Sequence, residues 1–304
     1  MTKFSVIGAG RLGTALAFAL TRRGWELEVI ADRNPAAARE ARRIIGRGVA
    51  TKDMRRAVRG ATVIFLCVPD DAVEGAARKL AAMATDWTGR TVFHASGLLP
   101  AAALEALRRK GARVAALHPV QSFPEKKGSA RLFRGVVWTV EGDREAVRLG
   151  MSIARKLGGR AMRLPGDSKP LYHAACSLAS NALVALEAAA AELLAGAGLG
   201  RRSAARVLWP LVQGTLQNVK KLGWERALTG PVARGDARTV RRHLEALGTR
   251  RLESVIYRAL AVKAVELAAR SGLAPGRVRA LKRLLEGRRL PPPAARRSYR
   301  KRVP

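Results

Sequence analysis

Phe4-Ser5-Val6-Ile7-Gly8-Ala9-Gly10-Arg11-Leu12-Gly13 contains the glycine pattern that indicates how the first half of the chain folds. Its first four residues are mostly apolar and predict a strand, and an Ala- and Leu-rich helical pattern begins at Leu12. The spacing G-x-G-x-x-G lies between them. Gly8 permits a tight turn, Gly10 lets the backbone approach a pyrophosphate, and Gly13 allows close helix–strand packing. The helix N-terminus favours an anion. The stretch, with Arg11 and Leu12 inside it, therefore predicts a dinucleotide-binding turn.

An acidic residue follows at the position that this motif requires. Asp32 comes 19 residues after Gly13, at the end of a second predicted strand. Its carboxylate is suited to accept hydrogen bonds from the ribose hydroxyls of NAD and would repel the 2′-phosphate of NADP. Arg33 offers the opposite chemistry, because a guanidinium can stack on adenine or pair with that phosphate. NAD is favoured, and NADP stays open.

The first half of the chain alternates short apolar runs with helical patterns, which is typical of a parallel α/β sheet. Val68 and Pro69 leave one of these runs at its carboxyl end, where the cofactor is expected, and Asp70 and Asp71 are interpreted as caps of the next helix. After Pro165 only helical patterns remain. The predicted fold class is therefore α/β, with a Rossmann dinucleotide-binding domain (1–165), an all-α domain (166–287) and a basic tail (288–304). The predicted strands are 4–7, 27–31, 63–68, 91–94, 114–117, 136–140 and 161–164.

Composition limits the classes of protein that fit. The 304 residues are 48% hydrophobic, which excludes a wholly disordered chain. Two cysteines cannot form a disulfide framework. The best apolar stretch, 181–200, is interrupted by Glu187 and Glu192, so no membrane span is expected. No signal peptide is recognised, because glycines and Arg11 break the first apolar run. We expect a soluble, cytoplasmic protein, and no metal site.

A net charge of +34 raises the question of nucleic acid. The basic residues are spread along the whole chain, and no helix-turn-helix, zinc-finger or stacking pattern accompanies them. The segment from Arg288 to Pro304 contains seven basic residues and no acidic ones, together with three consecutive prolines. We expect an extended or disordered tail that touches polyanions non-specifically, and solvated surface charge elsewhere.

The candidate reactive residues follow predicted strands, because ligands bind outside the carboxyl ends of such sheets. Ser96 lies in His94-Ala95-Ser96-Gly97, and His118 begins His118-Pro119-Val120-Gln121-Ser122-Phe123. A third position is the helix that opens the second domain. There Lys169, His173, Ser177 and Asn181 recur every four residues and form one polar stripe. Its length allows only Lys169, His173 and Ser177 near one small substrate, with Asn181 behind them. The alternative interpretation is structural: the four polar side chains would pack against arginine side chains or backbone of the first domain.

A helix-breaking loop, 227–236, interrupts the helical domain. Its Thr229, Arg234 and Asp236 are candidates to reach a substrate carboxylate or a dimer mate. Asp236 is equally well explained as the N-cap of the next helix, and Arg234 as a member of a structural ion pair.

Together these motifs resemble the 6-phosphogluconate dehydrogenase-like superfamily, and within it a bacterial oxidoreductase-like family whose C-terminal part is a domain of unknown function. The resemblance reaches to about residue 285. Pyrroline-5-carboxylate reductase, ketopantoate reductase, prephenate dehydrogenase and the β-hydroxyacid dehydrogenases are more distantly similar. Lys169 matches a lysine of the last group, whereas His173 replaces the asparagine four residues later. His118-Pro119 resembles a His-Pro near the active site of prephenate dehydrogenases. The resemblance also implies a homodimer formed through the helical domain.

The sequence thus predicts an NAD(P)-dependent dehydrogenase or reductase for a small carboxylate with a keto, hydroxy or imino group. Lys169 would donate the proton, His118 and His173 would orient the substrate, and Ser96 would bond near the nicotinamide. The alternative is a non-catalytic NAD(P)-binding regulator, which would keep the glycine turn without turnover.

Overall fold

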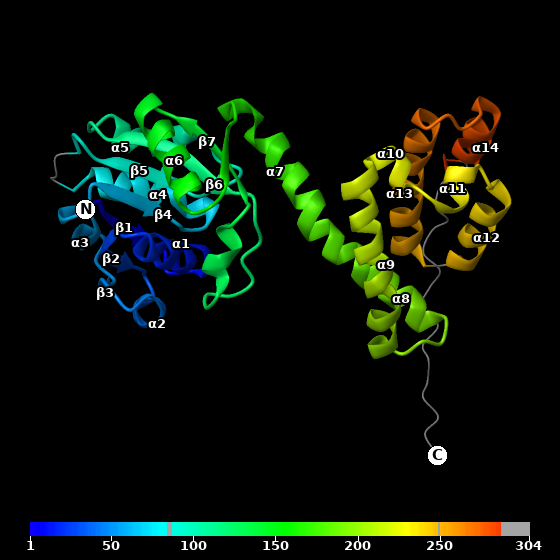
Figure 1. Ribbon diagram of the computed structural model, residues 1–304, viewed down its shortest axis with the longest axis horizontal. Helices are drawn as coiled ribbons and strands as arrows, with labels where there is room; N and C mark the ends of the chain where they lie inside the picture. Colours follow the sequence, from blue (N-terminus) through cyan, green and yellow to red (C-terminus); the bar gives the residue numbers. More distant parts are fainter. Residues whose placement is uncertain (84–86, 249, 287–304) are drawn as a thin grey trace, which may run out of the picture. The chain divides into compact units, whose positions relative to one another are not determined.

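The computed structural model describes residues 1–83, 87–248 and 250–286, which divide between Ser180 and Asn181 into two compact units (Figure 1). The predicted tail, 288–304, lies outside the described residues. The first unit contains the sheet, and the second is helical. The predicted α/β class, with a Rossmann-like part followed by helices, is confirmed.

An eight-stranded sheet organises the first unit, in the order β3-β2-β1-β4-β5-β6-β7-β8. All neighbours pair in parallel except β6 and β7, which are antiparallel. Strand β3 is a short edge strand that the sequence did not predict. The strands are β1 (Lys3–Ile7), β2 (Glu26–Ala31), β3 (Val49–Thr51), β4 (Val63–Leu66), β5 (Thr91–His94), β6 (Arg113–Pro119), β7 (Val137–Gly142) and β8 (Arg160–Arg163).

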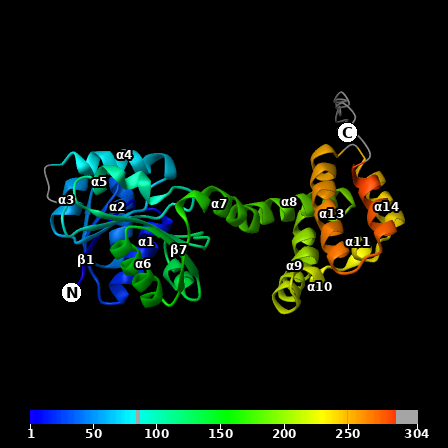
Figure 2. The same cartoon turned by 90° about the horizontal axis from the view of Figure 1, so that it is seen from above.

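Helices cover both faces of this sheet, so each face has its own apolar core (Figure 2). One core joins the sheet to α1 (Arg11–Arg22), α2 (Pro35–Ile45) and α6 (Arg144–Lys156). The other joins it to α3 (Met54–Arg59), α4 (Asp70–Ala81) and α5 (Glu105–Arg108). Buried Leu, Val and Ala fill both cores, because strands covered on both sides need side chains of that kind on each face. Short 3₁₀ turns lie in the connections that the structure describes: η1 (Ala101–Leu104), η2 (Ser129–Phe133) and η3 (Gly166–Ser168).

The long helix after the sheet differs from the prediction. It begins as α7 (Lys169–Ser177), passes through a π-helical segment, η4 (Leu178–Ala182), and continues as α8 (Leu183–Gly196). The four-residue repeat is covered only at its start, because Lys169 is buried and His173 is half-buried, whereas Ser177 and Asn181 are exposed.

The helical unit continues with α9 (Arg201–Leu222), α10 (Trp224–Ala227), α11 (Gly230–Arg234), α12 (Ala237–Leu247), α13 (Arg251–Arg270) and α14 (Pro275–Glu286). Its core is small and lies among α11 to α14. Val240, Val265 and Leu281 are fully buried there.

One helical stretch, Gly166–Gly196, is long and apolar enough to cross a membrane by length and composition, with a mean hydropathy of 1.5. It begins before the apolar stretch singled out from the sequence and includes the polar first turns of α7. Core helices of soluble proteins have the same length and composition, but here none of the apolar window is buried.

Candidate functional site

The glycine turn after β1 is packed so closely that side chains are excluded at two of its positions. Gly8 has a φ of +105°, and a Cβ there would lie 2.2 Å from the Cys67 carbonyl oxygen. A Cβ on Gly13 would lie 2.0 Å from the Gly8 carbonyl oxygen. Gly10, by contrast, is exposed, and its Cβ position has nothing within 4 Å. Gly8 and Gly13 thus build the turn, whereas Gly10 leaves an open approach to the backbone. That arrangement fits a dinucleotide pyrophosphate at the start of α1.

Asp32 is fixed by the same turn. One carboxylate oxygen accepts the Ala9 N–H and the other the Asn34 N–H, both at 2.8 Å. Each oxygen keeps a lone pair for a further donor. The side chain is half-buried at the end of β2, while Arg33 beside it is exposed. Asp32 is therefore held where a ribose hydroxyl would be expected, and Arg33 is free to reorient.

The residues after the carboxyl end of β4 lie beside the glycine turn, because β4 pairs with β1. Val68 is half-buried and Pro69 is exposed. Asp70 and Asp71 were interpreted as caps, which is wrong. They occupy the first turn of α4, whose N-cap position is Pro69, and no side chain caps it. Carboxylates in a first turn still stabilise a helix through its dipole.

Lys169 is a lysine inside the protein: only 1% of its surface is exposed, whereas lysine side chains are almost always exposed. Its Nζ donates a hydrogen bond to the Ser96 carbonyl oxygen at 3.0 Å. Burial lowers the pKa of the ammonium, and the negative charges of Glu141 and Asp70 oppose that shift. Burial also raises the pKa of Glu141, whose carboxylate accepts the Ala101 N–H.

Ser96 belongs to a loop that its own side chain and His94 hold in place. The Ser96 hydroxyl oxygen accepts the N–H groups of Leu98 and Leu99 at 3.1 and 2.9 Å. The Nδ1 atom of His94 accepts the Ser96 N–H at 3.2 Å, and its Nε2 donates to the Pro100 carbonyl oxygen at 3.1 Å. Both ring nitrogens of His94 are thus occupied, so this histidine stabilises the loop after β5.

His118 lies next to this loop. Its Nδ1 atom is 2.6 Å from the Tyr172 hydroxyl oxygen, and its ring centroid is 6.4 Å from that of His173. A Cβ on Gly97 would meet His173 Cδ2 at 2.7 Å and His118 Nε2 at 3.0 Å, so the loop backbone runs against both rings. Burial, followed by the charge of Lys169, lowers the pKa of both His94 and His118 to about 4. Both rings are neutral at physiological pH.

The structure therefore brings together Lys169, Ser96, His118 and His173 of the predicted set. Ser177 is exposed on α7. Asn181, Thr229 and Arg234 belong to the other unit, and each is exposed there.

Three side chains at the site were missed by sequence reasoning. The Tyr172 hydroxyl contacts His118, and the charge of Glu141 raises the pKa of Lys169. The Thr139 hydroxyl donates to the Tyr172 oxygen at 3.2 Å. Thr139 is paired with His118 across the antiparallel β6–β7 ladder. A usable signal existed for Tyr172, which is three residues after Lys169 and so lies near it on the helix surface. No comparable sequence signal pointed to Thr139 or Glu141.

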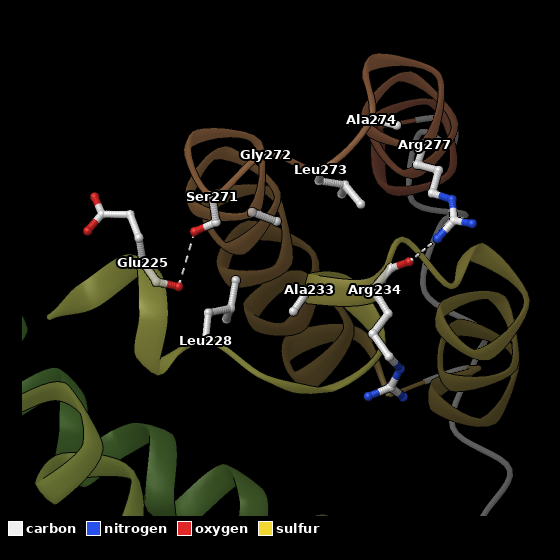
Figure 3. Close-up of a pocket in the computed structure, with 10 residues that line it drawn as sticks. Glu225, Leu228, Ala233, Arg234, Ser271, Gly272, Leu273, Ala274 and Arg277 are labelled. Atoms are coloured by element: carbon white, nitrogen blue, oxygen red, sulfur yellow. Dashed lines mark hydrogen bonds between the residues drawn. The ribbon is translucent and has the colours of Figure 1, made fainter. Parts of the chain in front are cut away.

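A surface pocket of about 540 Å³ lies in the helical unit (Figure 3). Arg234 contributes to its wall, and its carbonyl oxygen accepts a hydrogen bond from Arg277 Nη1 at 2.7 Å. The Ser271 hydroxyl donates to the Glu225 carbonyl oxygen at 3.3 Å on the other side (Figure 3). Asp236 proves to be the N-cap of α12, since it accepts both the N–H and the hydroxyl of Thr239.

Within residues 1–83, 87–248 and 250–286, no group of three or more His, Cys, Asp or Glu side chains is arranged to hold a metal ion.

The chain is similar to known proteins in both of its parts. The family model of a Rossmann-like domain matches residues 2–119, and that of the Domain of unknown function (DUF2520) matches residues 136–286. No curated protein matches the sequence. Protein TM1727 from Thermotoga maritima is 26% identical, with 88% of this chain and 99% of that chain covered and a TM-score of 0.68.

Two other solved structures share the fold. Protein BF3122 from Bacteroides fragilis is 23% identical over 86% of this chain and 97% of that one, with a TM-score of 0.71. A reductive aminase from Aspergillus terreus, in complex with NADPH and ethyl-5-oxohexanoate, is 17% identical over 94% and 93%, with a TM-score of 0.60.

Proposed function

Because the chain joins a Rossmann-like domain to a DUF2520 domain, we propose that it is an NAD(P)-dependent oxidoreductase acting on a small keto, hydroxy or imino carboxylate. One observation carries the proposal. The glycine turn, Val68-Pro69 and Ser96-Gly97 follow β1, β4 and β5, and His118 lies at the carboxyl end of β6. These four strands are neighbours in the sheet and run in parallel. A dinucleotide turn and a cluster of acid–base side chains therefore share one sheet edge, where ligands of such folds bind.

Gly8, Gly10, Arg11, Leu12 and Gly13 would hold the pyrophosphate, and Asp32 the adenosine ribose. The cofactor, when bound, supplies or accepts the hydride. Asp32 favours NAD, since its fixed carboxylate would repel a 2′-phosphate. Arg33 is exposed beside it, and the fold is shared with a reductive aminase solved with NADPH, so NADP is the outcome to test against.

Lys169 is the proposed proton donor. Its single described hydrogen bond, to the Ser96 carbonyl, leaves two of the three ammonium N–H groups for a substrate oxygen or nitrogen. Burial lowers its pKa, which makes proton release easier near neutral pH than for an exposed lysine. His118 and His173 orient the substrate, and Ser96 keeps the loop beneath it in place.

The test is turnover with NADH or NADPH and a panel of 2-keto and cyclic imino acids, in the wild type and in Lys169→Met. Methionine keeps most of the side-chain volume and removes the proton and the charge. We expect the variant to bind cofactor normally and to lose turnover by about 10² to 10⁴-fold. Undiminished turnover would remove Lys169 from the mechanism. Cofactor binding without turnover of any substrate in the wild type would favour the regulator.

We also propose that the protein is a homodimer whose contact includes the exposed faces of α8 and α9 in the helical unit. Large apolar side chains are exposed there, among them Val184, Trp209 and Leu211, at 60 to 71% of their surface. Exposed apolar surface of this kind marks an interaction site. A lipid environment suits it poorly, because α7, which continues into α8 through η4, holds Lys169, Tyr172 and His173 against polar groups of the sheet unit.

Light scattering on a size-exclusion column tests the dimer. We expect twice the chain mass of 32.7 kDa for the wild type and the chain mass for Val184→Lys. A monomeric wild type at micromolar concentration would refute the dimer.

A further inference from the structure

A chain of three side chains leads from the interior of the sheet unit to His118. The Thr139 hydroxyl donates to the Tyr172 oxygen at 3.2 Å, and that oxygen lies 2.6 Å from His118 Nδ1. Thr139 is 7% exposed, and Tyr172 and His118 are half-buried. Neither Tyr172 nor Thr139 has a role in the proposed cofactor binding or proton transfer.

The direction of the short contact follows from hydrogen-bond chemistry. The Tyr172 oxygen already accepts from Thr139, so its own O–H is available to donate. The neighbouring Cys176 sulfur is a weak acceptor, whereas an unprotonated imidazole nitrogen is a good one. Burial raises the pKa of Tyr172 to about 12 and lowers that of His118 to about 4, so both groups are neutral over the physiological range.

If Nδ1 accepts, the single ring hydrogen of neutral His118 must be on Nε2. That atom faces the loop after β5, since a Cβ on Gly97 would lie 3.0 Å from it. The Ser96 carbonyl in the same loop receives Lys169 Nζ. Nε2–H therefore points toward the region where the proposed substrate meets Lys169.

We propose that Tyr172, supported by Thr139, is a positioning residue that fixes His118 as the Nε2–H tautomer, so that His118 acts as a neutral hydrogen-bond donor to a lone pair of the substrate. This inference rests on the proposed function for its role in catalysis, but the tautomer itself is a property of the protein alone. In this arrangement Lys169 supplies the proton and the positive charge, and His118 orients the substrate through one hydrogen bond.

The groups that surround His118 are consistent with a donor role. Burial, and after it the charges of Lys169, His173 and His94, lower the pKa of His118, so a second positive charge on this ring is disfavoured. A neutral donor is the form that can coexist with a charged Lys169.

The experiment is long-range ¹H–¹⁵N NMR of the four histidine rings at pH 7, with His118 assigned by its loss in His118→Gln. We expect the Nε2–H tautomer in the wild type and a mixed population in Tyr172→Phe, which removes the donor and little else. An Nδ1–H tautomer in the wild type, or an unchanged His118 in Tyr172→Phe, would overturn the proposal. This readout needs no substrate, so it stands apart from any failure of the proposed function.

The chain contains a matched control. Tyr257 and His243 form a second pair with the same geometry in the helical unit, with the hydroxyl 2.8 Å from Nδ1. Tyr257→Phe should change the His243 signals and leave those of His118 unchanged. Where turnover is found, Tyr172→Phe should lower kcat about tenfold or more at unchanged cofactor affinity, as expected for loss of one orienting hydrogen bond. Tyr257→Phe should leave kcat unchanged. Equal kcat in the wild type and Tyr172→Phe would refute the role in positioning.

Discussion

Acid should destabilise the sheet unit through His94, whose ring is 1% exposed and occupied on both nitrogens. Protonation would place a hydrogen on Nδ1, directly opposite the Ser96 N–H that it now accepts. The ring would then have to turn or leave its position. Burial and the nearby Lys169 charge are the physical reasons that its pKa falls to about 4.

The magnitude follows from linkage. The pKa of His94 is depressed in the folded state, so between pH 4 and the unfolded value of about 6.5 the unfolded chain binds more protons. Stability contributed by His94 is therefore present above about pH 6.5 and is lost as the pH falls. Lowering the pH from 8 to 5 should cost about 2 kcal/mol at this one residue. His118 shifts in the same direction and adds to the loss.

The assay is urea unfolding at pH 8, 6 and 5, followed through the buried Trp87 and Trp138 of the sheet unit. His94→Gln cannot titrate, so its stability should fall less than that of the wild type between pH 8 and pH 5, by about 2 kcal/mol. A His243→Gln variant, altered in the helical unit, is the matched control and should keep the wild-type slope. The reasoning is refuted if His94→Gln and the wild type lose the same stability over this range.

Three glycine substitutions separate structural from ligand-facing roles. Gly13→Ala places a methyl group 2.0 Å from the Gly8 carbonyl oxygen, so thermal stability and cofactor affinity should both drop. Gly10→Ala meets no protein atom within 4 Å, so the melting temperature should change little while affinity for NADH or NADPH falls at least tenfold. An unchanged affinity would move the pyrophosphate away from Gly10. Gly97→Ala drives a methyl group toward the His173 and His118 rings, so kcat should fall while cofactor affinity, measured by titration, stays at the wild-type value.

Much of the fold could be read from the sequence because its signals are local. Most residues of each predicted strand are apolar or β-branched, and the glycine spacing specifies one turn with little freedom. The edge strand β3 was not predicted, because its three residues, Val49–Thr51, are too few to show the alternation of apolar and polar residues that indicates a strand. The π-helical segment was equally invisible, since nothing in Leu178–Ala182 differs from ordinary helical sequence.

The site divides in the same way. His118 and Ser96 were predictable because parallel strands end at one edge of the sheet. Thr139 and Glu141 were not, because they reach the site through the antiparallel pairing of β7 with β6, which places Thr139 opposite His118. That pairing depends on tertiary contacts and has no local signature. Tyr172 was not predicted because it lies three residues after Lys169 and therefore outside the four-residue repeat, although residues three apart are also neighbours on a helix.

The proposed function requires the glycine turn to bind a nicotinamide dinucleotide at the carboxyl ends of the parallel strands, where His118 and Lys169 lie. Titration of the wild type with NADH and NADPH, followed by energy transfer from the five tryptophans, tests it most directly. We predict saturable binding that Gly10→Ala weakens at least tenfold, with NADH the tighter ligand because of Asp32. A folded wild-type protein that binds neither nucleotide would show that the glycine turn is not a nicotinamide dinucleotide site.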